Sequence, residues 1–381
     1  MKPELQSWLT EKRHELHQVP EISGEERGTA ASISNLLLAC GPDAVLTGIG
    51  GHGVAAVYES GQPGPTIGIR CELDGLPIQE ISSARYASQH PGKGHLCGHD
   101  GHMAMVLGVA FVLGDKRPAK GRVVLIFQPA EETGQGAIAF RADHKFANIA
   151  PDYVYSLHNL PGLELGAVEM CSGPANCASR GMRIVLTGKT SHAAAPQDGL
   201  SPAGALAELI PALAALGHGG ALDADYALTT LTHARLGETT FGVAPGMAEL
   251  WVTLRTVSDT RMTGLIREAE QLVSASAQAH GLGVEISYDD VFEACVNTDE
   301  AVQILSEACQ TRDIPCKLVP TPQRFSEDFG QFGKGAKTAM FWLGAGRDHP
   351  QLHNPDYDFP DALIPIGTDI FLAAIEQTLK A

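Results

Sequence analysis

The sequence predicts an α/β fold with a second, smaller α+β domain inserted into it. Short β-like runs alternate with helical stretches before residue 178, which favours a sheet with helices on its faces. After this region, six predicted elements follow in the order β-α-β-β-α-β, which is typical of a ferredoxin-like arrangement. We therefore expect a first domain made of residues 1–177 and 293–381, and an inserted domain of residues 178–292.

The elements of the first domain are predicted in chain order. Helices over residues 3–18 and 25–40 are separated by Ser23 and Gly24, and Gly41-Pro42 stops the second helix. Beyond them we predict strands over residues 54–58, 66–70, 122–127, 153–157 and 338–343, helices over 103–113 and 136–146, and a Gly-, Pro- and Ser-rich loop over 71–102.

The inserted domain supplies the remaining elements. They are a strand over residues 182–187, an Ala-rich helix over 201–216, strands over 226–234 and 248–256, a long helix over 259–280 and a strand over 284–289. The chain then returns to the first domain.

The composition is that of a folded protein with a core. Of 381 residues, 44% are hydrophobic and 19% are charged. The formal net charge of −17 argues against nucleic acid as a partner, because phosphate binding needs clustered Lys and Arg. No run of about 18 apolar residues appears, so we expect no membrane span.

Cysteine usage predicts the compartment. The eight cysteines are scattered without a C-x-x-C pair, and residues 1–13 lack the apolar stretch of a secretion signal. We therefore expect reduced thiols in a cytoplasmic protein, not a disulfide framework.

A stretch of nine residues, 94–102, holds three imidazoles, a thiol and a carboxylate. Cys97 and His99 are two positions apart, and Gly98 allows a tight turn between them. A thiolate and an imidazole from one turn can both face a metal, and this pair suits zinc and neighbouring transition metals. The cluster therefore predicts a metal site in preference to a surface turn.

Two adjacent carboxylates, Glu131 and Glu132, follow the predicted strand 122–127. Adjacent carboxylates point in different directions, so one can bind metal while the other handles a proton. Metal-assisted hydrolysis needs this division of roles. The alternative is a solvated pair that complements the dipole of the following helix.

Isolated histidines occur in two Leu-His-Asn triplets. His158 follows the predicted strand 153–157, and His353 follows the predicted strand 338–343. Because ligands bind at the carboxyl edge of such sheets, these histidines are expected to converge with the other donors. A hydrogen-bonded turn histidine is the alternative for each.

Two further polar residues are candidates for supporting roles. Asp74 follows a strand and is expected to fix the tautomer of a ligand histidine, or else to form an Asx-turn before Gly75. His192 follows a strand of the inserted domain. It is a candidate for stabilising an oxyanion across a cleft, with a capping or surface role as the alternative.

The order of these motifs resembles one group of enzymes, the amidohydrolase branch of the aminoacylase and carboxypeptidase metallopeptidase superfamily (clan MH). This group includes N-acyl-amino-acid amidohydrolases, hippurate hydrolases and auxin-conjugate hydrolases. The resemblance spans about residues 12 to 367. Its motifs are Arg13-His14-Glu15-Leu16-His17, Asp74-Gly75-Leu76-Pro77, Cys97-Gly98-His99-Asp100-Gly101-His102, Gln128-Pro129-Ala130-Glu131-Glu132, Leu157-His158-Asn159, Ser191-His192-Ala193 and Leu352-His353-Asn354-Pro355.

The resemblance implies a mixed-sheet catalytic domain with two metal ions and an inserted lid that also forms a dimer interface. Glu131 matches the general base of the group, and His192 matches the lid histidine that assists the tetrahedral intermediate. In many relatives that histidine reaches the neighbouring subunit, so action in cis or in trans stays open here. The positions that match metal ligands are Cys97, His99, Glu132, His158 and His353.

Two departures from the family pattern bear on the site. Glu72 replaces an Asp of the family motif, which keeps the charge but lengthens the arm. Gly242 replaces an Asn of the lid that, in relatives, helps to hold the substrate carboxylate. Arg255 is then the nearby candidate for binding such a carboxylate.

The implied reaction is hydrolysis of the amide bond of a small N-acyl amino acid or a related conjugate. Zinc or manganese are the expected metals, with cobalt and nickel as alternatives. The expected assembly is a homodimer or higher homo-oligomer. Three other functions stay open: a carboxypeptidase or dipeptidase acting on short peptides, a non-catalytic metal-binding protein, and a thiol hydrolase with Cys97 as the nucleophile.

Overall fold

A computed structural model of the chain describes residues 1–380 and divides it into two compact units. The first unit holds Met1–Ala175, Cys295–Pro320 and the chain from Glu327 onward, and the second holds Asn176–Ala294 with Thr321–Ser326. The short segment Thr321–Ser326 lies inside the range 293–381 that we assigned to the first domain. It belongs to the second unit because Ser326 donates a hydrogen bond to the Cys177 carbonyl at 2.7 Å.

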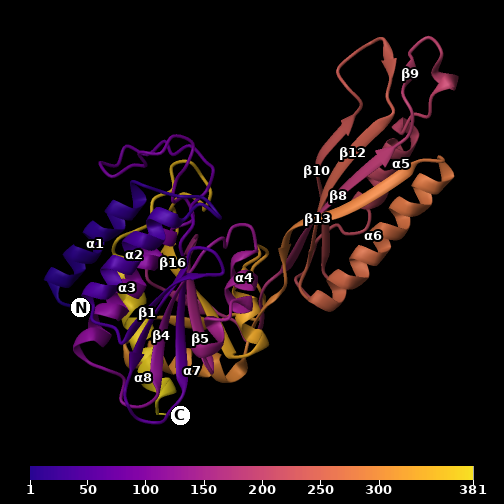
Figure 1. Cartoon of the computed structure of the whole chain (residues 1–381). Helices are drawn as coiled ribbons and strands as arrows, with labels where there is room; N and C mark the ends of the chain where they lie inside the picture. Colours follow the sequence, from indigo (N-terminus) through magenta and orange to yellow (C-terminus); the bar gives the residue numbers. More distant parts are fainter. Residues whose placement is uncertain (381) are drawn as a thin grey trace. The chain divides into compact units, whose positions relative to one another are not determined.

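The first unit is built on an eight-stranded mixed sheet with the strand order β1-β2-β4-β3-β5-β16-β6-β15 (Figure 1). The strands are β1 Ala44–Ile49, β2 Gly53–Glu59, β3 Thr66–Glu72, β4 Arg122–Gln128, β5 Tyr153–Pro161, β6 Val168–Met170, β15 Cys316–Leu318 and β16 Lys337–Gly346. Strands β4, β3, β5 and β16 run parallel to one another, and β2 is antiparallel to β4. The central strands are buried on both faces, which explains their nearly continuous apolar sequence.

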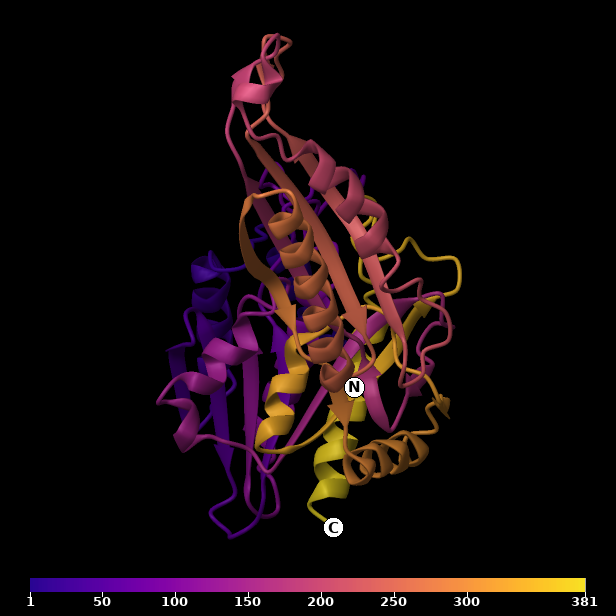
Figure 2. The same cartoon turned by 90° about the vertical axis from the view of Figure 1, so that its right-hand side faces the viewer.

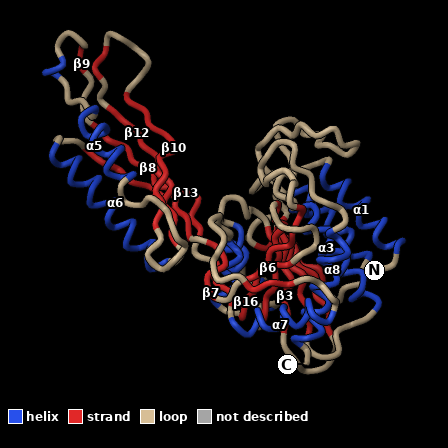
Figure 3. The backbone as a smooth tube through the Cα atoms, turned by 180° about the vertical axis from the view of Figure 1, so that it is seen from behind, coloured by secondary structure: helices blue, strands red, loops and turns tan. Residues whose placement is uncertain are grey.

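Helices cover this sheet, as the tube drawing also shows (Figure 3). They are α1 Pro3–His17, α2 Arg27–Ala39, α3 His99–Asp115, α4 Gly136–Ala142, α7 Asp299–Thr311 and α8 Leu363–Thr378, with 3₁₀ turns η1 Phe146–Asn148 and η3 Asp328–Lys334. Helix α3 is almost entirely buried and packs against α1, α8 and strand β3. Two short strands, β7 Gly173–Asn176 and β14 Cys295–Asn297, pair with each other.

The second unit has the predicted β-α-β-β-α-β order. Its elements are β8 Ala178–Thr187, α5 Ala203–Ala214, β10 Ala227–Leu236, β12 Met247–Thr256, α6 Asp259–Ala279 and β13 Gly283–Phe292. The strands form an antiparallel sheet in the order β10-β12-β8-β13, with α5 and α6 packed side by side (Figure 2). Two short strands, β9 Ser191–His192 and β11 Val243–Ala244, pair separately, and η2 spans Pro196–Asp198.

Three predicted boundaries differ from the structure near the candidate residues. The predicted loop 71–102 is shorter, because α3 already begins at His99. Gly98 has φ +87°, a left-handed conformation that turns the chain directly into the helix. Strand β5 continues past residue 157, so His158 lies within the strand, where Trp342 of β16 is its register partner.

The predicted helix 136–146 is also too long. Helix α4 ends at Ala142, because Asp143 is extended and its carboxylate accepts hydrogen bonds from the backbone N–H groups of Gly50 at 3.0 Å and Lys145 at 2.9 Å. Within residues 1–380, no helix combines the length and the apolar character that crossing a membrane requires.

Candidate metal centre

Parallel strands bring the candidate residues to one edge of the sheet. Strand β4 ends at Gln128, and Glu131 and Glu132 follow in the next turn. The neighbouring strand β5 carries His158 near its carboxyl end. The turn before α3 and the first residue of that helix add Cys97 and His99. Donors from distant parts of the sequence therefore meet where an α/β sheet binds ligands.

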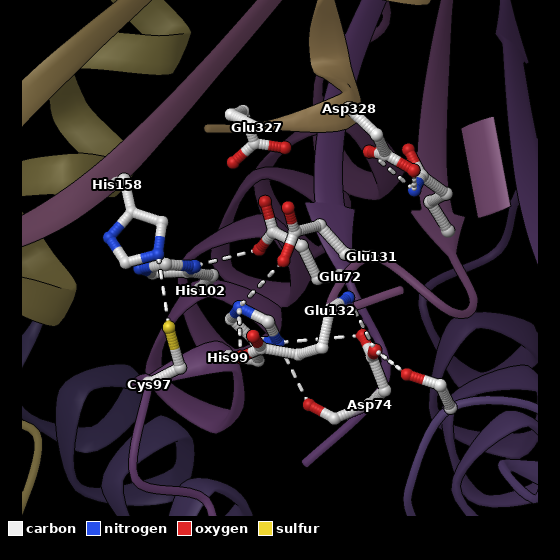
Figure 4. A network of polar contacts seen from close by, with 12 residues as sticks. Glu72, Asp74, Cys97, His99, His102, Glu131, Glu132, His158, Glu327 and Asp328 are labelled. Carbon is white, nitrogen blue, oxygen red and sulfur yellow. Dashed lines mark hydrogen bonds and ion pairs between the residues drawn. The ribbon is translucent and has the colours of Figure 1, made fainter. Parts of the chain in front are cut away.

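The donor atoms of these residues lie close together (Figure 4). Cys97 Sγ is 3.3 Å from His158 Nε2. His99 Nε2 is 4.0 Å from a carboxylate oxygen of both Glu131 and Glu132. Cys97, His99, Glu131 and His158 are buried, and Glu132 is partly exposed.

His353 approaches the same cluster from the C-terminal part of the first unit. Its Nε2 is 3.6 Å from Glu132 Oε2, and its side chain is 49% exposed. Its backbone has φ +65°, and its N–H donates to the Leu96 carbonyl at 2.8 Å. This hydrogen bond holds the turn with His353 against the segment that carries Cys97, although the left-handed conformation is unfavourable for a non-glycine residue.

The donors fit two metal ions. One set is Cys97, His99 and His158, and another is Cys97, Glu132 and His353; within each set the ligand atoms lie within 4.8 Å of one another. His99 Nε2 and Glu132 Oε1 are buried and have no hydrogen-bond partner among the described residues. A buried polar atom without a partner is costly, and a bound cation would remove that cost.

Hydrogen bonds fix the tautomers of the two buried histidines. His99 Nδ1 lies 2.8 Å from the Asp74 carbonyl, and His158 Nδ1 lies 2.7 Å from the Asn159 carbonyl. Because a carbonyl oxygen only accepts, both Nδ1 atoms carry the proton. Each Nε2 lone pair is then left to face the donor cluster, which is the arrangement that metal-binding histidines need.

Asp74 supports the cluster in a second way. Its carboxylate accepts hydrogen bonds from the Ser23 hydroxyl at 2.7 Å and from the backbone N–H of Glu132 at 3.0 Å. The tautomer of His99 is fixed by the Asp74 carbonyl, and the Asp74 carboxylate holds the backbone of Glu132. The Asx-turn alternative does not describe these contacts.

The electrostatics of the cluster follow from burial. Burial raises the pKa of Glu131 well above its usual value, and the carboxylates of Glu327 and Glu132 raise it further. Burial also raises the pKa of Glu132 to about 7, against the effect of the neighbouring His99. Burial and Glu132 together raise the pKa of the Cys97 thiol. The thiolate and both carboxylates would all be stabilised by a cation.

The second unit carries His192 and Arg255. His192 is exposed on β9, and its Nδ1 accepts a hydrogen bond from the N–H of Ala194 at 3.1 Å. Arg255 lies on β12 and donates from Nη1 to the Arg324 carbonyl and to the Ser326 hydroxyl, both at 2.8 Å.

Comparison with known proteins identifies the family. The profile of Peptidase family M20/M25/M40 matches residues 68–377. The chain belongs to this family.

Relatives of known name match the M20 chain over nearly its whole length. An N-acetyldiaminopimelate deacetylase of Listeria monocytogenes (strain HCC23) is 30% identical, covering 96% of this chain and 98% of the relative. A hippurate hydrolase of Campylobacter jejuni is 30% identical, covering 99% and 98%. The solved structure of Bacillus subtilis YXEP, described as a dinuclear metal binding peptidase of this family, is 25% identical with a TM-score of 0.83, covering 100% and 99%. The resemblance seen in the sequence is thereby confirmed.

Several residues of this M20 site were missed by the sequence analysis. Arg70 is fully buried; its Nε donates to Gln128 at 2.9 Å, and its Nη2 donates to Glu327 at 2.9 Å and Asp328 at 2.8 Å. Arg70 also pairs with Glu72. A sequence signal for this part of the site was the adjacent acidic pair Glu327-Asp328, which directly precedes the apolar Phe329. It is comparable to the acidic pair Glu131-Glu132, which follows a strand.

His102 was counted in the cluster but given no role. Its Nδ1 lies 2.7 Å from Glu72 Oε2, and its Nε2 lies 3.2 Å from the backbone nitrogen of Asn159. Because the Asn159 N–H only donates, Nε2 accepts, and the proton sits on Nδ1. Both nitrogens of His102 are therefore engaged with protein groups, whereas Nε2 of His99 has no hydrogen-bond partner among the described residues.

Proposed function

We propose that the chain is a metal-dependent amidohydrolase that cleaves the amide bond of small N-acyl amino acids or related conjugates. The observation that carries the proposal is the position of Glu131, a buried carboxylate next to a donor set that already contains Glu132. A non-catalytic metal protein has no need of this second carboxylate. The relatives support the substrate class, since their names describe deacetylation of N-acetylated compounds and hydrolysis of hippurate.

Two divalent ions would be held by five side chains. Bound ions of this kind polarise a scissile carbonyl and lower the pKa of a coordinated water. The thiolate donor favours zinc, while manganese, cobalt and nickel are compatible with the carboxylate and imidazole donors. The five side chains are Cys97, His99, Glu132, His158 and His353.

Glu131 would act as the general base. Its carboxylate is buried beside the donor set, 4.0 Å from His99 Nε2, where it can accept a proton from a water and return it. As the water oxygen bonds to the carbonyl carbon, Glu131 takes the water proton. It then delivers that proton to the amide nitrogen as the C–N bond breaks, which yields a free amine and a carboxylic acid, and the acid loses its remaining proton to solvent.

His192 and Arg255 would contact the substrate from the lid. The Ala194 N–H occupies Nδ1 of His192, so the neutral ring carries its proton on the exposed Nε2 and can donate to the developing oxyanion. Arg255 would bind a substrate carboxylate in place of the Asn that Gly242 has replaced. Action of His192 in trans would require the expected homodimer.

The cysteines of the described chain are free thiols, which supports the expected cytoplasmic location.

A substrate panel tests the proposal. Acetyl-, benzoyl- and indoleacetyl-amino acids are compared with dipeptides, before and after chelation and after addition of zinc or manganese. We expect metal-dependent release of the amino acid from the acylated substrates. Preferential cleavage of dipeptides would favour a peptidase, and chelator-resistant activity would favour a thiol hydrolase that uses Cys97. Tight metal binding without amide hydrolysis would overturn the proposal.

A further inference from the structure

The proposed function leaves one part of the two Leu-His-Asn triplets unexplained. It uses His158 and His353 but gives no role to the asparagine that follows each of them. The structure treats these asparagines differently: Asn159 is fully buried, whereas Asn354 is exposed. The two triplets have the same sequence but differ in the burial of the asparagine amide, so they provide an internal comparison.

Asn159 connects the turn that carries Cys97 with the strand that carries His158. Its side-chain Nδ2 donates to the Cys97 carbonyl at 2.7 Å. Its own carbonyl accepts from His158 Nδ1 at 2.7 Å. A single residue therefore holds the backbone of the thiol donor and the ring of an imidazole donor. The contact is close, because a Cβ on Gly98 would lie only 2.5 Å from Asn159 Nδ2.

His102 and Glu72 anchor Asn159 from the side of α3. The backbone nitrogen and the Nδ2 of Asn159 lie 3.2 and 3.1 Å from His102 Nε2. His102 in turn donates to Glu72 at 2.7 Å, and Glu72 pairs with the buried Arg70. The long arm of Glu72, which departs from the family pattern, completes this connected chain of buried groups.

Tyr357 links Asn159 to the third donor segment. The Tyr357 hydroxyl donates to Asn159 Oδ1, and the ring is fully buried. The Tyr357 N–H donates to the Asn354 carbonyl at 3.0 Å, which closes the turn next to His353. All polar atoms of the Asn159 side chain are thus used to join the segments that hold Cys97, His158 and His353.

We propose that Asn159 is a positioning residue that holds these three segments at the spacing needed for tight binding of the metal pair. The inference rests on the proposed function, because it assumes that these donors bind metal. It assigns no such role to Asn354, whose side chain is exposed. A side chain that only filled space would not need the three directed hydrogen bonds that the Asn159 amide makes to Cys97, His102 and Tyr357.

The test compares Asn159→Leu with the matched control Asn354→Leu. Zinc stoichiometry and affinity are measured by competition with a chromophoric chelator, with thermal unfolding of the zinc-free proteins as a check of the fold. We expect Asn159→Leu to weaken zinc binding by about 10–100-fold, as loss of outer-shell partners does in other metal sites. We expect Asn354→Leu to bind zinc as the wild type does. Equal zinc affinities in the two variants would overturn the inference.

A milder variant covers the case in which Asn159→Leu does not fold. Tyr357→Phe keeps the buried ring and removes only the hydroxyl that donates to Asn159 Oδ1. We expect a smaller loss of zinc affinity in the same direction, and wild-type affinity in this folded variant would overturn the inference. Failure of the proposed function looks different: the wild-type protein itself would then bind fewer than two zinc ions, or would bind zinc without hydrolysing any amide.

Discussion

Apart from His353, which is 49% exposed, the first unit buries its chemically active side chains, whereas those of the second unit are exposed or partly exposed. In the first unit, His99 is fully buried, and Cys97 and His158 are at most 5% exposed. In the second unit, His192 is exposed and Arg255 is partly exposed. The buried donors lie beside carboxylates such as Glu131 and Glu132, whose pKa values burial raises, whereas His192 contacts the Ala194 backbone and Arg255 contacts a carbonyl and a hydroxyl.

This difference shows where each unit depends on a ligand. Burying charged or unpartnered polar groups costs several kcal/mol unless a counter-charge is present. The first unit therefore needs a cation to complete its structure. The exposed groups of the second unit are solvated and cost little, so they are free to change partners when a substrate arrives.

Metal removal should have a larger effect on activity and stability than any single substitution, because it acts on the buried donors of the first unit. We expect exhaustive chelation to reduce amide hydrolysis to background and zinc to restore it. Zinc at about 1,000 times its dissociation constant should also stabilise the folded chain by about 4 kcal/mol. Activity assays and thermal unfolding, each run with and without zinc, would measure the two effects. Unchanged unfolding temperatures would show that the buried donors are stable without a cation, and the contrast between the units would fail.

Substitution of Glu131 should give the next largest effect. Glu131→Gln keeps the size of the side chain but removes its capacity to accept a proton. We expect kcat to fall by about 10²–10⁴-fold, the usual contribution of a general base, while both metal ions stay bound. Steady-state kinetics and metal analysis are the measurements. The control is Glu164→Gln, a change at an exposed residue whose side chain is 73% accessible. Turnover near that of the wild type in Glu131→Gln would remove Glu131 from the mechanism.

Loss of the lid histidine should have a smaller effect than loss of the base. We expect His192→Ala to lower kcat about 10²–10³-fold, as removal of one oxyanion donor does in other enzymes. Zinc stoichiometry should stay at the wild-type value, because His192 lies outside the donor cluster. His218→Ala, at another exposed histidine of the same unit, is the control. If zinc binding fell together with kcat, His192 would belong with the buried donors and the contrast would need revision.

Local signals explain which elements could be predicted from the sequence. The helix predicted over 259–280 is found as Asp259–Ala279, because Ser258 caps its first turn by accepting from the Arg261 N–H, and Gly281 follows its end in a left-handed conformation. The three-residue strands β6 and β15 were not predicted. Their existence depends on pairing with each other and with β16, which no local pattern reveals.

The residues of the candidate site also fall into two groups: some carry a local sequence signal, and others are brought together only by the fold. Cys97, His99 and Glu131 could be selected because each lies in a short run of chemically unusual residues. The pairing of Arg70 with Glu327 joins residues 257 positions apart, so their spacing in the sequence carries no signal. The role of Asn159 likewise depends on contacts that only the folded chain brings together.

The smallest expected effect concerns stability and compares one buried histidine with one partly exposed histidine. In the first unit, His17 is fully buried; its Nδ1 lies 2.8 Å from Asp100 and its Nε2 lies 3.3 Å from Glu80. In the second unit, His280 forms a 3.0 Å pair with Glu208 at the surface. The two carboxylates on opposite sides of the His17 ring favour its protonated form, whereas the Arg13 guanidinium, 3.2 Å from Nδ1, opposes it.

Burial alone would lower the pKa of His17, but Asp100 and Glu80 outweigh burial and raise the pKa from 6.5 to about 9. The stability contributed by this protonated ring is therefore complete below pH 6.5 and is lost as the pH rises through about 9. We expect His17→Gln to remove up to about 3 kcal/mol of this pH dependence, since one pKa unit corresponds to about 1.4 kcal/mol. Urea unfolding at several pH values, with zinc held constant, measures it. His280→Gln should change stability by less than about 1 kcal/mol, as exposed ion pairs contribute little. Equal pH profiles for the two variants would show that burial does not separate the histidines of the two units.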